Sequence, residues 1–195
     1  MLFVEPIRDK KKIAQIKNLL RGQGRYRDLL LFVTGINSAL RISDLLQLKA
    51  NHFFDERGQI NRRFWIKERK RGKRHEVVIN GSIKEALDEY LAAFPNIWKK
   101  GDNFVFSSSS TNDYSHPIKR GQAWKLINSI CHEVGLSGNY GTHSLRKTWG
   151  YHARMNGVDL ALIMHKLNHE SIAYTKRYLG ITDDELEAVA QRLNL

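Results

Sequence analysis

The stretch NHESIAYTKRY, residues 168–178, places a histidine at position 169 and tyrosines at positions 174 and 178. The two tyrosines are four residues apart, so on a helix they lie on one face. One interpretation is that both rings pack against neighbouring side chains. The other is that one hydroxyl is a nucleophile, which requires further groups that bind and activate a substrate. The rest of the chain decides between them.

The composition is that of an ordinary globular protein. The chain has 195 residues, 42% of them hydrophobic and 27% charged, which is enough for one substantial domain. A single cysteine, Cys131, cannot form an internal disulfide, which favours a reducing compartment. The start MLFVEPIRDKKK lacks the pattern of a signal peptide, and the apolar run LLLFV at 29–33 is too short to span a bilayer. We therefore expect a cytoplasmic protein.

The net charge is the first indication of function. Thirty-two lysines and arginines against twenty acidic residues leave +12. An excess of this size favours a polyanionic partner, most often a nucleic acid. An anionic membrane is disfavoured because no basic amphipathic segment carries an opposite face rich in tryptophan or phenylalanine. The alternative is a surface of solvated lysines without a partner.

The periodicity predicts a mixed α/β fold that is mostly α-helical, with a small antiparallel β-hairpin. Residues 59–69 and 73–80 alternate as strands around the glycine-containing turn at 70–73. Ser43 is expected to cap a short helix over 44–49, with three leucines turned inward. The remaining helices are predicted over 5–22, 26–40, 82–94, 120–135, 143–156, 158–166, 170–178 and 182–194.

Three separate motifs contain residues that could carry chemistry. In THSLRKT (142–148), His143 and Arg146 are three apart at the start of a helix, where a phosphate is well placed, although they could also be a cap histidine and a surface cation. In ALRISDLLQL (39–48), Arg41 and Asp44 have the same spacing, and the alternative is a capping box with Arg41 in solvent. Lys70 lies in the hairpin turn, which could place a lysine ammonium in a site as a proton donor. The turn could equally be a basic wing that contacts the DNA backbone.

A metal site is not expected. His165 and His169 are four residues apart, a spacing that suits two ligands on one helix. No glutamate follows in an H-E-x-x-H pattern, and no cysteine or acidic cluster supplies further ligands. We expect neither a metal nor another cofactor.

Taken together and in this order, the motifs resemble the catalytic domain of the tyrosine recombinases, the lambda-type phage integrase family. The resemblance runs from about residue 5 to residue 180 and rests on ALRISDLLQL, KRGKRHEVVI, HSLR and LNHESI, followed by a tyrosine nine residues after the histidine. It implies the DNA breaking-rejoining fold of that family. It also implies that Tyr178 is the nucleophile, whereas Tyr174 stands where the family often has threonine and is assigned to packing or a phosphate contact.

The resemblance further implies a role for each motif. The expected catalytic residues are Tyr178, Arg41, Arg146, His143, His169 and Lys70, with Lys73 as the alternative hairpin lysine and Asp44 as a supporting residue. The basic residues expected to contact DNA are Lys67, Arg69, Arg71, Lys73, Arg74 and Lys147. Such an enzyme cuts and rejoins DNA through a 3′-phosphotyrosine without metal or ATP, in integration, excision or inversion.

The family also implies an assembly. It predicts double-stranded DNA target sites, a monomer when free, a tetramer on synapsed DNA and accessory DNA-bending proteins, in a bacterial or phage-encoded system at the nucleoid. Residues 1–181 are assigned to the catalytic domain and 182–195 to a helical tail that docks on a neighbouring protomer, and the core-binding domain that usually precedes the catalytic one is expected to be absent. The alternatives are a DNA-binding module inactive without that domain, or a topoisomerase-like relaxing enzyme.

Two positions and one segment depart from the family pattern. Asn168 and Ala39 stand where glycine is usual, and the preceding segment TGINS is slightly lengthened.

Overall fold

The structure, a computed structural model, describes residues 4–70, 72–108, 113–181 and 191. The chain divides into two compact units, Met1–Trp149 and Gly150–Leu195. The described residues are mostly helical with one two-stranded antiparallel sheet, which confirms the predicted class. In chain order the elements are α1 (Lys10–Gly22), α2 (Tyr26–Ser38), α3 (Ile42–Leu45), α4 (Ala50–Phe53), β1 (Arg63–Lys67), β2 (Arg74–Val78), α5 (Gly81–Ala93), the 3₁₀ helix η1 (Ile97–Lys99), α6 (Arg120–Glu133), α7 (Thr142–Met155), α8 (Leu160–Lys166) and α9 (Ile172–Leu179).

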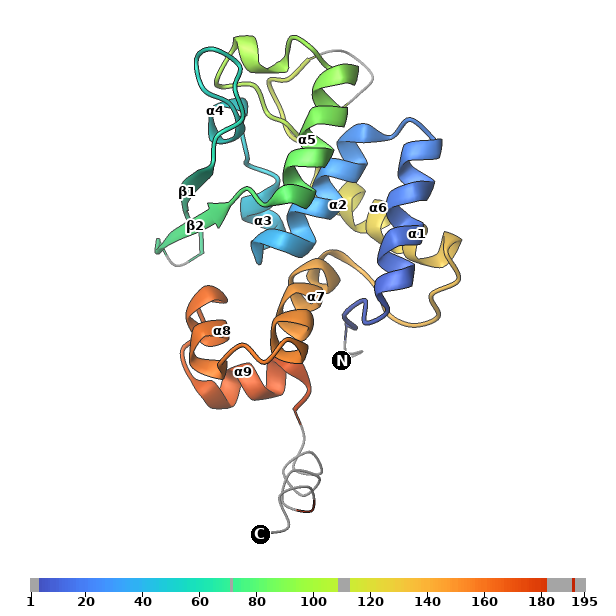
Figure 1. Ribbon diagram of the computed structural model, residues 1–195, viewed down its shortest axis with the longest axis vertical. Helices are drawn as coiled ribbons and strands as arrows, with labels where there is room; N and C mark the ends of the chain where they lie inside the picture. The colour runs from blue at the N-terminus through green and yellow to red at the C-terminus, as the bar shows by residue number, and fades with distance from the viewer. Residues whose placement is uncertain (1–3, 71, 109–112, 182–190, 192–195) are drawn as a thin grey trace. The chain divides into compact units, whose positions relative to one another are not determined.

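Helix α2 is the central helix of the first unit. It packs against α1 on one side and α5 on the other (Figure 1). Residues 29–35 are all buried, so this part of the helix is covered all round, as its apolar run at 29–33 requires. Burying each large apolar side chain fully contributes about 1.5–3 kcal/mol. None of the helices within the described residues combines the length and apolarity that a bilayer crossing needs.

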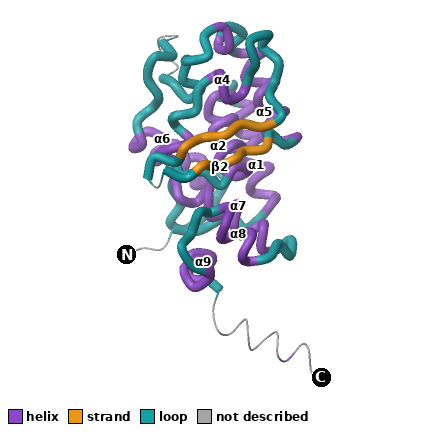
Figure 2. The backbone as a smooth tube through the Cα atoms, turned by 90° about the vertical axis from the view of Figure 1, so that its left-hand side faces the viewer, coloured by secondary structure: helices purple, strands orange, loops and turns teal. Residues whose placement is uncertain are grey.

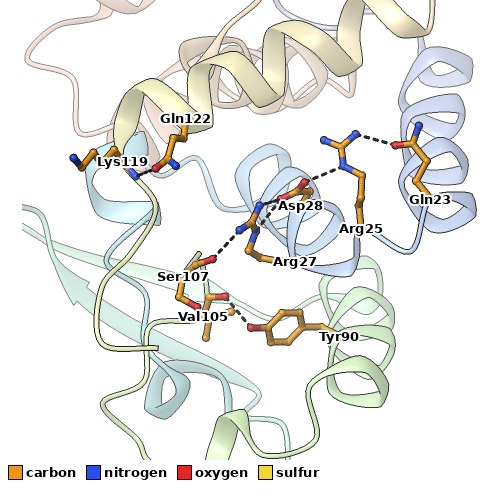
Figure 3. A network of polar contacts seen from close by, with 9 residues as sticks. All are labelled: Gln23, Arg25, Arg27, Asp28, Tyr90, Val105, Ser107, Lys119 and Gln122. Carbon is orange, nitrogen blue, oxygen red and sulfur yellow. Dashed lines mark hydrogen bonds and ion pairs between the residues drawn. The ribbon is translucent and has the colours of Figure 1, made fainter. Parts of the chain in front are cut away.

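Polar contacts fix the segment 105–107 to this helical layer (Figure 3). Arg27 of α2 donates to the carbonyl oxygen of Ser107 at 2.8 Å and is held by the carboxylate of Asp28 at 2.7 Å. The hydroxyl of Tyr90 on α5 donates to the carbonyl oxygen of Val105 at 2.8 Å. These bonds satisfy main-chain carbonyl groups that are otherwise costly to bury.

The hairpin predicted around residues 70–73 is confirmed. Strands β1 and β2 lie side by side (Figure 2) and pair antiparallel, from Arg63 opposite Val78 to Lys67 opposite Arg74. Side chains alternate between the two faces, so that Phe64, His75 and Val77 are buried.

The helix predicted over 5–22 begins later, at Lys10, and is capped by Asp9. Residues 4–9 before it lie in neither a helix nor a strand, and Ile7 donates its amide hydrogen to Thr148 Oγ1 at 2.8 Å. Because that partner is distant in sequence, the local pattern did not reveal it. The helices predicted over 82–94, 120–135, 143–156, 158–166 and 170–178 are confirmed with boundaries that differ by one or two residues.

The prediction of a short helix over 44–49 capped by Ser43 was wrong. Helix α3 spans Ile42–Leu45 instead, and a second short helix, α4, follows at Ala50–Phe53. The three leucines expected to face inward are buried as predicted: Leu45, Leu46 and Leu48. The burial pattern was therefore correct although the helix boundaries were not.

In the second unit, side-chain caps define the helix starts. Asp159 accepts the amide of Ala161 at the start of α8, and Ser171 accepts the amide of Tyr174 at the start of α9. Ile163 and Leu167 are fully buried within this unit. The helix predicted over 182–194 falls outside the described residues, apart from position 191.

The reactivity of the Cys131 thiol can be used to test the packing of α6. It is fully buried, and burial raises its pKa to about 12. We expect a thiol reagent such as Ellman's reagent to leave the native protein unmodified at about pH 8 and to react fully in denaturant, because only the exposed thiolate reacts. Rapid modification of the native protein would contradict this packing.

Candidate functional site

Arg146 is buried at the start of α7, with 3% of its surface exposed. Its Nη1 donates to the carbonyl oxygen of Ala39 at 2.6 Å. The alternative that Arg146 is a surface cation is therefore wrong. A buried guanidinium held by a main-chain carbonyl is fixed in orientation, as an oxyanion-binding group should be.

Arg146 reaches the carbonyl oxygen of Ala39 because α2 and α7 approach each other closely. A β-carbon added at Gly35 of α2 would lie 2.6 Å from Leu145 Cδ1, so glycine lets the two backbones come together. Helix α2 ends at Ser38, and Ala39 after it has a left-handed φ of 60° that turns the chain. Arg41 follows two residues after Ala39, the residue that Arg146 contacts.

Arg41 is also held rather than solvated. Its side chain is 15% exposed, and Nη1 lies 2.6 Å from Oε2 of Glu68, a carboxylate whose side chain is fully buried. The alternative that Arg41 lies in solvent is therefore wrong. The structure thus gathers the two predicted arginines around one connection, residues 39–41.

Asp44 fastens the hairpin to this connection. It is 2% exposed, and its Oδ1 accepts the amide hydrogen of Arg69 at 3.0 Å. Its partner is therefore the end of the hairpin and not the start of a helix, as a capping box would require. The carboxylate thus sets the position of the residue next to Lys70, and the supporting role of Asp44 stays a prediction.

The hairpin presents its basic side chains to the outside. Glu68 donates its amide to the carbonyl oxygen of Lys73 at 2.9 Å, and Gly72 donates to the carbonyl oxygen of Glu68 at 2.8 Å, which closes the turn around Lys70. The exposed basic residues of the hairpin are Arg63, Lys67, Arg69, Lys70, Lys73 and Arg74. Arg74 lies over the ring of Trp65, 4.8 Å from its centroid. The predicted contact residue Arg71 falls outside the described residues.

His143 reaches the surface from the first turn of α7. Partial burial lowers its pKa, and the positive charges of Arg120, Arg146, Lys147 and Arg41 lower it further. The imidazole is therefore neutral near pH 7 and able to accept a proton.

Lys147, predicted to contact DNA, is 6% exposed. Burial lowers its pKa to about 8, and the nearby carboxylate of Glu5 opposes that effect. A contact with DNA would therefore use a small exposed part of this side chain. Its predicted role stays a prediction.

The second unit contains the histidine and the tyrosines of the opening stretch. The rings of His169 and Tyr178 meet edge to face, with centroids 4.8 Å apart, and Tyr174 lies 4.7 Å from His169 in the same manner. Tyr174 is 52% exposed, whereas Tyr178 is partly buried and its hydroxyl oxygen is shielded from solvent. The two tyrosines therefore have different surroundings, as two different roles require.

Hydrogen bonds set the tautomer of His169. The hydroxyl of Thr175 donates to the carbonyl oxygen of Ser171 at 3.0 Å, so its oxygen accepts from Nδ1 of His169 at 3.1 Å. The Nε2 atom of a neutral His169 then carries a lone pair. Asn168 precedes it with a φ of 47°, a left-handed conformation that asparagine tolerates better than most residues.

Two buried residues beside Arg41 were missed in the sequence. Glu68 is 1% exposed and His75 is 3% exposed. Strand alternation signals both, because Glu68 continues the inward set of Phe64 on β1 and His75 that of Val77 on β2. In the described part of the chain, no three His, Cys, Asp or Glu residues gather in a way that could hold a metal ion.

Comparisons with known proteins agree on one kind of protein. A model described as the phage integrase family matches residues 9–185. The "Probable integrase/recombinase YoeC" of Bacillus subtilis is 37% identical over 188 residues, which cover 96% of each chain. The tyrosine recombinase XerD of Chlamydia pneumoniae is 28% identical over 165 residues, 83% of this chain and 50% of that protein.

The fold has close structural counterparts. The post-cleavage complex of the site-specific recombinase XerH with palindromic difH substrate aligns with a TM-score of 0.76 at 21% identity. The alignment covers 99% of this chain and 53% of XerH, so this chain spans about half the length of XerH, as it does of XerD. At this identity the likeness establishes the fold, which is the breaking-rejoining fold that the sequence predicted.

Proposed function

The chain belongs to the phage integrase family, the tyrosine recombinases, and we propose that six of its side chains cut and rejoin double-stranded DNA at specific sites. The observation that carries the proposal is the pair of held arginines at the connection 39–41: the buried Arg146 on the carbonyl oxygen of Ala39, and Arg41 on Glu68. Two fixed guanidinium groups can clamp the non-bridging oxygens of a phosphodiester and stabilise the charge that grows there in the transition state. This supports phosphoryl transfer that requires no metal.

Tyr178 is the proposed nucleophile. Its oxygen attacks the scissile phosphorus, the bond from phosphorus to the 5′ oxygen breaks, and a 3′-phosphotyrosine forms. His143 takes the tyrosine proton, and Lys70 protonates the departing 5′ oxygen. His169 donates to a phosphate oxygen from Nε2 in its protonated form, because its Nδ1 already donates to Thr175. Attack by a second 5′-hydroxyl reverses these steps without ATP, because the phosphotyrosine keeps the energy of the broken bond.

The wider assembly follows from the same proposal. The exposed basic residues of the hairpin contact the DNA backbone, where lysine and arginine position a protein without reading bases. Strand exchange between two duplexes uses four protomers, with accessory DNA-bending proteins at some sites, in the compartment that holds the DNA. The tail at 182–195 docks on a neighbouring protomer, and residues 1–181 form the catalytic part.

Covalent capture tests the proposal directly. The protein is incubated with fragmented genomic DNA of its source and denatured with SDS, and the DNA that stays attached is sequenced. We expect attachment at a defined site through a peptide that contains Tyr178. Salt-sensitive binding without attachment would overturn the proposal in favour of a DNA-binding module. Rejoining of single duplexes without exchange between two would indicate a relaxing enzyme.

The pH dependence of attachment tests the role of His143. Because its pKa lies below the ordinary value of 6.5, the base is neutral at pH 7 and is lost when the imidazole gains a proton at lower pH. We expect the single-turnover attachment rate to stay constant from about pH 8 to about pH 6.5 and to fall below that. The variant His143→Gln should be slower and lack the fall at acid pH. A wild-type rate that already falls well above pH 6.5 would exclude this assignment.

A further inference from the structure

We propose that Glu68 is a positioning residue that holds Arg41 in the orientation needed to bind the scissile phosphate, an inference that rests on the proposed function. Glu68 belongs to none of the motifs that mark the site in the sequence. It lies at the end of β1, on the inward face of the hairpin. Glu68 therefore does not contact the phosphate itself, and it acts on it by orienting Arg41.

Glu68 is a buried charged residue, and its burial requires a partner of opposite charge. A fully buried carboxylate is costly unless opposite charge and hydrogen bonds compensate it. Here Oε2 lies 2.6 Å from Nη1 of Arg41. That nitrogen is shielded from solvent, whereas the Arg41 side chain as a whole stays 15% exposed. The pair therefore holds Nη1 inward, and the exposed 15% of the side chain is the part that a ligand can reach.

His75 lies beside the second oxygen of the carboxylate. Its Nε2 lies 3.0 Å from the carbonyl oxygen of Ser38, and because a carbonyl only accepts, Nε2 carries the hydrogen. Its Nδ1 lies 3.5 Å from Oε1 of Glu68. Glu68 thus pairs with Arg41 on one side and has a histidine, bonded to the last residue of α2, next to it on the other.

The same residue also closes the lysine turn. The main chain of Glu68 bonds to both Lys73 and Gly72, and Asp44 holds the next amide, that of Arg69. Glu68 therefore contacts both the turn that carries Lys70, through its main chain, and the guanidinium of Arg41, through its side chain. A change at Glu68 disturbs the group that binds the phosphate while the hairpin pairing itself remains.

The test compares two synthetic duplexes that carry the site recovered by covalent capture. One has the natural scissile phosphate, and the other has a methylphosphonate there, which lacks one charged oxygen and depends less on an arginine. For Glu68→Gln we expect the ratio of attachment rates, phosphate over methylphosphonate, to fall at least about tenfold, because displacing a binding group by a fraction of an ångström has effects of this size. The ratio does not depend on how much of the variant folds.

Glu76→Gln is the matched control. Glu76 is a partly exposed carboxylate on β2, paired with Arg63 at 2.8 Å, and its variant should keep the wild-type ratio. A Glu68→Gln ratio equal to wild type, even with a lower melting temperature, would show a merely structural role and overturn the inference, while attachment by the wild type leaves the proposed function intact. Absence of attachment by the wild type on both duplexes would overturn both.

Discussion

Replacing Tyr178 by phenylalanine is expected to abolish covalent attachment to DNA, to below detection in an SDS gel. The variant removes the attacking oxygen alone. The ring can keep its edge-to-face contact with His169, at a centroid distance of 4.8 Å, so the second unit should stay folded. Circular dichroism and salt-dependent DNA binding should match the wild type, which would assign the loss to chemistry.

Tyr174→Phe is the matched control for that experiment. Tyr174 contacts the same histidine, at 4.7 Å, but is half exposed. We expect its attachment rate to remain within about threefold of wild type, because the loss of one exposed hydroxyl removes at most one weak hydrogen bond. Loss of attachment in Tyr174→Phe with retention in Tyr178→Phe would exchange the roles of the two tyrosines.

Replacing Arg146 by alanine is expected to slow attachment by about 10³-fold or more, the size of effect seen when a preorganised oxyanion donor is removed. It should also lower the free energy of unfolding by about 1–3 kcal/mol, because the buried carbonyl of Ala39 loses its 2.6 Å donor. Single-turnover attachment and urea unfolding measure the two effects separately.

Arg146→Lys separates charge from geometry. Lysine keeps the positive charge but cannot contact the carbonyl and a phosphate at once through a planar fork. We expect a rate between those of alanine and wild type. Equal rates for Arg146→Lys and wild type would exclude a bidentate contact, and an unchanged rate in Arg146→Ala would remove Arg146 from the site.

Local sequence patterns were sufficient to predict most of the helices and the hairpin. The hairpin at 70–73 was predictable because glycine and strand alternation act over a few residues, and the helices over 26–40 and 82–94 because their apolar faces repeat. The start of α1 was not predictable, since Ile7 bonds to Thr148, far along the chain, and residues 5–9 are not helical. Tertiary partners overrode local propensity there.

The residues of the candidate site were predictable from the sequence, but their surroundings were not. The motifs named Arg41 and Arg146, but each taken alone allowed a solvent-exposed cation. Their burial depends on partners far apart in sequence, Glu68 and the carbonyl of Ala39. Glu68 was overlooked because it lies among basic residues in KERKRGKRH, where composition indicated a solvated wing. Reading the inward register of the strand would have identified it.

The left-handed Ala39 has a consequence for mutational studies of this protein. Its contribution to the site is a peptide oxygen, which every amino acid supplies, so exchange for glycine relieves backbone strain at φ 60° and leaves the acceptor in place. A systematic alanine scan would pass over this position without a signal. A backbone ester at the bond between Ala39 and Leu40 weakens that oxygen as an acceptor and so reaches a part of the enzyme that side-chain replacement does not.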